Sequence, residues 1–113
     1  MICNSDDVLE VIRKANKAKE SMIYFDQKLK RIAFFYDTYH RGFQFDNKNF
    51  KKWEKYITRH YKPSKRITAA SETGLFIGTE GMIKRNFGSI VPMADLIEQG
   101  YCKKPSWVNN ERL

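Results

Sequence analysis

The segment from Ile32 to Tyr36 is apolar on both faces of the strand that it would form. It reads Ile-Ala-Phe-Phe-Tyr, and further runs of β-branched and aromatic residues precede and follow it. Successive side chains of a strand point to opposite faces of a sheet, so a strand without alternation needs cover on both sides. We therefore predict three short antiparallel strands, at 22–26, 31–37 and 41–46, in a sheet that other elements cover on both faces. The turns between them are expected at 27–30 and 38–40.

A first helix is predicted before these strands, from residue 5 to about residue 20. Ser5 and Asp6 can cap its amino end, and the carboxylates of Asp7 and Glu10 suit the positive end of the helix dipole. Apolar residues then follow at helical spacing: Val8, Leu9, Val11, Ile12, Ala15 and Ala18.

A second helix is predicted after the strands, capped by Asp46 or Asn47 and running to about Tyr61, before Pro63. At about 100° per residue, its apolar side chains fall on one side. They are Phe50, Trp53, Ile57 and Tyr61. The opposite side carries six basic residues and no acidic one: Lys48, Lys51, Lys52, Lys55, Arg59 and Lys62. Glu54 lies nearer the apolar side.

Residues 67–101 are expected to be mainly helical but interrupted by glycine, with a short helix at 91–100 and a tail at 102–113. Within 66–85, an alanine, a glycine four residues later and then a leucine resemble the first helix and turn of bacterial DNA-binding helix-turn-helix units. The stretch departs from that pattern at Glu80, and at Gly78 and Gly81, which weaken a recognition helix. A glycine-punctuated segment packed over the sheet is the alternative.

The 113 residues favour one domain. The predicted fold class is α+β: an N-terminal helix, a three-stranded antiparallel sheet, a basic amphipathic helix and a short helical C-terminal segment, with the core in 5–62. The order α-β-β-β-α, with lysines on the second helix, is similar in outline to a double-stranded-RNA-binding domain. That family's glycine-rich stretch is missing, and Phe50 and Trp53 replace its small residues. The resemblance therefore implies topology, and we do not carry its function over.

The positive charge of the chain is concentrated in one region. The net charge is +8, and residues 41–66 hold nine basic residues against Asp46 and Glu54. The rest of the chain is nearly balanced. Phosphates repeat along a nucleic acid, and affinity grows with the number that a protein neutralises. Lysine outnumbers arginine here, which favours contact with the backbone over reading of base edges.

The leading hypothesis is therefore non-enzymatic binding of DNA or RNA with weak sequence preference. The predicted nucleic-acid-binding residues are Lys48, Lys51, Lys52, Lys55, Arg59, Lys62, Lys65 and Arg66. The main alternative is a phage or mobile-element protein that binds and inhibits, or regulates, a host protein such as a nucleic-acid-handling complex. Small size, an AT-rich type of composition and a basic patch fit that alternative. A merely solvated helix face is the third interpretation.

A ββα-type metal-dependent nuclease is a further hypothesis. His40, Asn47 or Asn49, and His60 follow one another across a predicted hairpin and helix, but the acidic neighbour usual beside the histidine base is absent. Cys3 and Cys102 are nearly a hundred positions apart and suggest neither a disulfide framework nor a metal pair. We therefore expect no catalytic residue, no metal and no cofactor.

The aromatic residues allow two interpretations, a packed core or an exposed platform for stacking single-stranded bases. They are Tyr24, Phe25, Phe34, Phe35, Tyr36, Tyr39, Phe43 and Phe45. No apolar run reaches the roughly 18–20 residues of a membrane-spanning helix, and residues 1–7 show no secretory signal. The expected location is the cytoplasm, with both thiols reduced.

Overall fold

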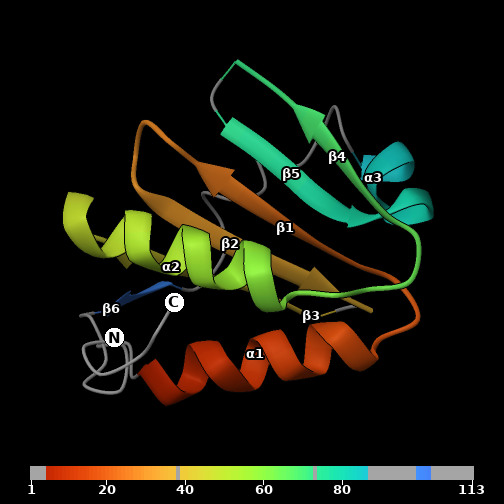
Figure 1. The fold of residues 1–113 in the computed structure, drawn as a ribbon, viewed down its shortest axis with the longest axis horizontal. Coiled ribbons are helices and arrows are strands. Elements are labelled where there is room, and N and C mark those ends of the chain that lie inside the picture. Colours follow the sequence, from red (N-terminus) through yellow and green to blue (C-terminus); the bar gives the residue numbers. More distant parts are fainter. Residues whose placement is uncertain (1–4, 38, 73, 87–98, 103–113) are drawn as a thin grey trace.

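The structure, a computed structural model, describes residues 5–37, 39–72, 74–86 and 99–102. Its elements are α1 (Ser5–Lys17), β1 (Ser21–Asp26), β2 (Arg31–Tyr36), β3 (Tyr39–Phe45), α2 (Asn47–His60), β4 (Arg66–Ala70), β5 (Gly74–Thr79), α3 (Glu80–Asn86) and β6 (Gln99–Cys102). The strands form one sheet in the order β4-β5-β1-β2-β3-β6 (Figure 1). The first five strands are antiparallel, whereas β6 pairs with β3 in parallel. The α+β class and the first five predicted elements are therefore confirmed.

The three-stranded sheet was a wrong prediction, and so was the helical character of residues 66–79. These residues form the β4–β5 hairpin, whose second strand pairs with β1. The helix-turn-helix interpretation of 66–85 fails for the same reason, because only α3 at its end is helical. The predicted helix at 91–100 lies outside the described residues up to residue 98, and its last two positions open β6. Residues 103–113 also lie outside them.

The surroundings of Gly78 explain why β5 contains glycine. A Cβ on this residue would lie 2.6 Å from the carbonyl oxygen of Ser21 and 2.7 Å from the Cα of Met22, both on β1. A Cβ on Gly74 would overlap the carbonyl oxygen of Phe25 in the same way. The two glycines allow β5 to approach β1 closely, as glycine in a strand often does.

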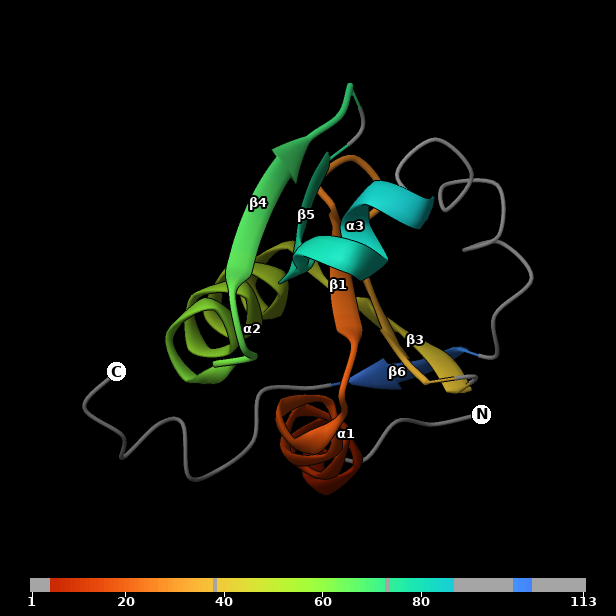
Figure 2. The ribbon, with the colours of Figure 1, turned by 90° about the vertical axis from the view of Figure 1, so that its right-hand side faces the viewer.

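The sheet is covered on both faces, as the apolar segment 32–36 requires. On one face, α1 and α2 bury Ile32, Phe34 and other side chains in the larger cluster of the core. On the other face, Met82 and Ile83 of α3 pack with Ala33, Phe35 and their neighbours. Figure 2 shows α2 and α3 on opposite sides of the strands. The prediction of cover on both sides is confirmed.

The ends of α2 are fixed by polar contacts. At its start, a side-chain oxygen of Asp46 accepts a hydrogen bond from the backbone N–H of Asn49 at 2.7 Å, which is an N-cap. After its end, the Tyr61 hydroxyl lies 2.5 Å from the Ser21 hydroxyl, and Thr79 bonds to the backbone of Ser21. Burial raises the pKa of Tyr61 to about 12. The C-terminal end of α2 is therefore anchored to β1 through Tyr61 and Ser21. Within the described residues, none of the helices is long and apolar enough to cross a membrane.

Candidate nucleic-acid interface

Five of the six basic residues predicted on one side of the second helix lie on the outer side of α2, and the sixth, Lys62, follows its C-cap residue Tyr61. We call them the basic row: Lys48, Lys51, Lys52, Lys55, Arg59 and Lys62. All are exposed except Lys52, which is half-buried. The opposite side of α2 is the apolar stripe Phe50, Trp53, Ile57 and Tyr61, buried against the sheet. The orientation of α2 is thus set by its apolar stripe, and the basic row follows from it.

Within the described part of the chain, no residue of the basic row forms an ion pair. Other basic residues do: Arg13 and Lys14 pair with Glu10, Arg41 with Asp7, Lys84 with Glu80, and Arg85 with Glu20. Glu54, the one acidic residue of α2, is hydrogen-bonded to the Gln27 side chain at the β1–β2 turn instead. The charge of α2 is therefore left uncompensated at the surface, whereas the charge of α1 and α3 is largely paired.

Three of the predicted contact residues lie beyond α2, and Lys65 and Arg66 differ from the exposed Lys62 in their surroundings. Lys65 is exposed in the loop before β4 and has a positive φ of 49°. Arg66 is half-buried, and its Nη1 donates to the carbonyl oxygens of Thr58 at 2.8 Å and Tyr61 at 2.7 Å. The last carbonyls of a helix have no partner within it, so Arg66 caps the C-terminal end of α2. The contacts of Arg66 therefore give its side chain a structural role.

Asn16 joins the two helices and was missed by sequence reasoning. Its side-chain amide donates to the carbonyl oxygen of His60 at 3.0 Å and accepts from the backbone N–H of Lys62 at 2.6 Å. This contact brings the C-terminal ends of α1 and α2 side by side (Figure 1). Lys17 and Lys19, both exposed, follow Asn16 closely in the chain and add charge at that end of the molecule. An asparagine on a helix gives no local signal for so distant a partner.

The aromatic residues of the strands are core and do not form a stacking platform. Seven of the eight are buried, and only Tyr39, at 45% exposure, is open to solvent. They sit between the helices and the sheet, where their rings pack edge to face, as Phe34 does with Phe43. The interpretation of these residues as core is confirmed.

The residues behind the nuclease hypothesis are not brought together. His40 of β3 is paired with Phe35, whose side chain belongs to the face covered by α3, whereas Asn49 and His60 are on α2 on the opposite face. Asn49 donates to Asp46, and His60 stacks on Tyr56 with ring centroids 4.1 Å apart. Among the described residues, no group of His, Cys, Asp and Glu side chains could hold a metal ion. Cys3 lies outside them.

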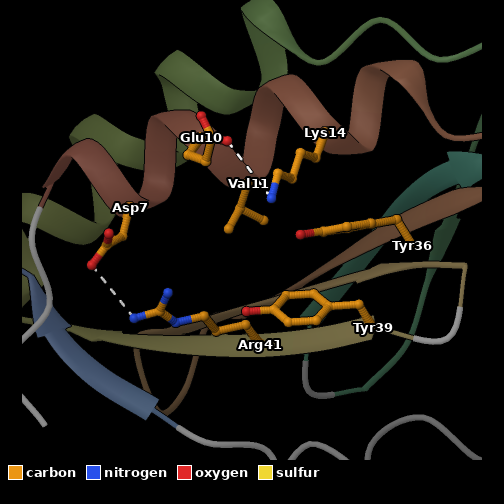
Figure 3. A pocket seen from close by; sticks show the side chains of 7 residues that line it. All are labelled: Asp7, Glu10, Val11, Lys14, Tyr36, Tyr39 and Arg41. Carbon is orange, nitrogen blue, oxygen red and sulfur yellow. Dashed lines mark hydrogen bonds and ion pairs between the residues drawn. The ribbon is translucent and has the colours of Figure 1, made fainter.

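A small pocket lies beside α1, away from the basic row (Figure 3). It measures about 240 Å³ and is lined by Asp7, Glu10, Val11, Lys14, Tyr36, Tyr39 and Arg41. Its charged groups neutralise one another: Asp7 is 3.5 Å from Arg41, and Glu10 is 3.7 Å from Lys14. The hydrogen bond from Arg13 lowers the pKa of Glu10, and burial raises the pKa of Tyr36. The pocket therefore presents paired ions beside the Tyr36 and Tyr39 side chains, and it is smaller than most ligand sites.

Comparison of the chain with protein-family models, with curated proteins and with solved structures gave no match. The geometry and charge of α2 are therefore the basis for a functional proposal.

Proposed function

We propose that the protein binds nucleic acid, DNA or RNA, through the basic row and Lys65, without catalysing a reaction on it. The observation that supports this most is the uncompensated charge of α2. Four exposed basic side chains and the half-buried Lys52 share one side of α2, and the exposed Lys62 follows its C-cap. None of the six forms an ion pair within the described residues. A polyanion is the partner that such a surface fits.

The residue types indicate the kind of contact. Lysine acts as a point charge with a flexible stem, whereas arginine recognises guanine edges through two parallel hydrogen bonds. The basic row contains five lysines and Arg59, so it suits phosphate oxygens rather than base edges. We therefore expect weak sequence preference and strong dependence on salt.

Charge reversal on α2 tests this proposal. Lys51 and Lys55 are exposed and lie at the centre of the basic row, so Lys51→Glu combined with Lys55→Glu should leave the fold intact. On duplex DNA, each phosphate contact contributes about 0.9 to the slope of log K against log salt concentration. Losing two contacts should therefore weaken the binding constant about fiftyfold at roughly 0.1 M salt. Fluorescence anisotropy with labelled oligonucleotides measures the loss, and circular dichroism checks the fold.

The matched control is Lys14→Glu combined with Lys84→Glu, which changes the net charge equally. Both residues are exposed, each forms one surface pair with a glutamate four positions earlier, and neither is on α2. Such exposed pairs contribute little to stability. The control should bind nearly as tightly as the original protein. Equal losses in both variants, or no binding of any DNA or RNA, would contradict the proposal.

A further inference from the structure

Among the residues that the structure describes, the basic row has no series of exposed rings beside it on which bases could stack. Phe50, Trp53 and Tyr61 of the apolar stripe are each at most 1% exposed. The Tyr56 ring is half-buried and contacts both Trp53 and His60, with centroids 5.6 and 4.1 Å apart. Only the His60 ring then lies open at the edge of the row. Proteins that bind single strands stack successive bases on several aromatic side chains, and α2 does not offer them.

The shape of the charged surface also matters. A single strand is usually held in a positively charged groove that follows its backbone. Here the basic row lies on the exposed side of one helix whose opposite side is buried against the sheet, and Figure 2 shows α2 on the outside of the strands. The pocket lined by Asp7, Glu10 and Arg41 lies beside α1 and β3 instead. An exposed, charged helix is complementary to a groove in the partner rather than to an extended strand.

The dimensions of α2 fit such a groove. Within α2 the basic row runs from Lys48 to Arg59, which is about 16 Å at 1.5 Å per residue, and Lys62 lies just beyond the C-cap. The major groove of duplex DNA is about 12 Å wide, admits an α-helix, and is bordered by a phosphate backbone on each side. A row of this length therefore reaches both backbones of a double helix, and the caps at Asp46, Asn16 and Arg66 hold it straight.

We propose that the nucleic acid bound by α2 is double-stranded, an inference that rests on the proposed function. The recognised feature is the pair of regularly spaced phosphate backbones. In duplex DNA they border the wide major groove, whereas in duplex RNA the major groove is deep and narrow and the accessible backbones border the wide minor groove. The lysines contact backbone oxygens of both strands while the apolar stripe holds α2 on the sheet. Base identity plays little part in this contact, because its donors are mainly lysine ammonium groups.

The experiment compares four labelled probes of one length and sequence: duplex DNA, duplex RNA and the single strand of each. Each phosphate contact contributes about 0.9 to the salt dependence on duplex DNA and about 0.7 on single strands. Six contacts therefore give the duplex an advantage of about fifteenfold at roughly 0.1 M salt, and four contacts give about sixfold. We expect a preference near the larger value in the original protein and in the Lys14→Glu, Lys84→Glu control, and a reduction towards the smaller value in the Lys51→Glu, Lys55→Glu variant.

The possible outcomes separate this inference from the proposed function. Tighter binding of either duplex supports the inference and tells whether DNA or RNA is preferred. Single strands bound as tightly as duplexes, with the same sensitivity to reversal at Lys51 and Lys55, overturn the inference and leave the proposed function standing. Absence of binding to all four probes overturns both.

Discussion

Tyr61 links the end of the charged helix to the sheet through one buried hydroxyl pair. Its side chain is fully buried and lies 2.5 Å from the Ser21 hydroxyl. Burial disfavours the phenolate, the hydrogen bond to Ser21 and the nearby charge of Arg66 partly oppose this, and the net result is the raised pKa of about 12. The group is therefore protonated in the folded protein well beyond the point at which it ionises in an unfolded chain.

This pKa predicts a loss of stability in alkali. The ordinary pKa of tyrosine is about 10, so between pH 10 and 12 the unfolded chain releases the proton while the folded one keeps it. The free energy of unfolding should fall by about 2 to 3 kcal/mol across this window because of Tyr61. Denaturant titrations of the original protein and of Tyr61→Phe, from pH 8 upward, measure it. The Phe variant should be less stable at pH 8 by about 1 to 2 kcal/mol, because Ser21 loses its partner, but should show a flatter alkaline decline. An equally steep alkaline fall in the free energy of unfolding of both proteins would contradict this role of Tyr61.

The β4–β5 hairpin is the element that sequence patterns placed wrongly. Residues 66–79 include alanine, threonine and glycine, whose preference for helix or strand depends on their surroundings in the fold. In the structure, β4 alternates half-buried and exposed positions from Ile67 to Ala70 because it pairs with β5, which in turn pairs with β1. Pairing over fifty residues of chain is a tertiary event, and no local periodicity reports it.

Two glycine substitutions distinguish the hairpin from the helical segment first expected. Gly78→Ala places a methyl group against the backbone of Ser21 and Met22, so it should destabilise the protein by about 1 to 3 kcal/mol. Gly81→Ala, exposed at the start of α3, meets only the movable carboxylate of Glu20 and gains helix propensity of up to about 1 kcal/mol. If Gly78 and Gly81 both lay in a helix, both substitutions would stabilise the protein. Thermal unfolding of the two variants gives the answer, and an increase in stability for both would contradict the β5 strand.

At the scale of the whole molecule, the charge is unevenly compensated rather than merely positive. The net charge is +8, yet the ion pairs gather on α1, α3 and β3 while the basic row of α2 has none among the described residues. The net charge of a protein attracts a polyanion only weakly, because dissolved salt screens it. Basic side chains fixed in a row can instead each contact one phosphate. The two cases differ in how binding responds to salt.

Binding measured against salt concentration separates them. If the six residues of the basic row and Lys65 each contact one phosphate, the logarithmic slope for duplex DNA should be about −6, at about −0.9 per phosphate. The Lys51→Glu, Lys55→Glu variant should lose about two units of slope, and the Lys14→Glu, Lys84→Glu control should keep the original value. A shallow slope in the original protein, or an equal change in both variants, would show that net charge alone drives association.

The sequence alone determined α1, the first three strands, α2 and the need to cover the sheet on both faces, because each depends on periodicity within a few turns or residues. It also placed the basic row on one side of a helix, since the apolar stripe dictates what faces outward. Only the tertiary structure decided the place of β4 and β5 in the sheet, the capping role of Arg66 and the bridge from Asn16 to α2. These contacts join residues far apart in the chain or at the surface of two elements. Their energies depend on docking geometry, which local sequence patterns do not encode.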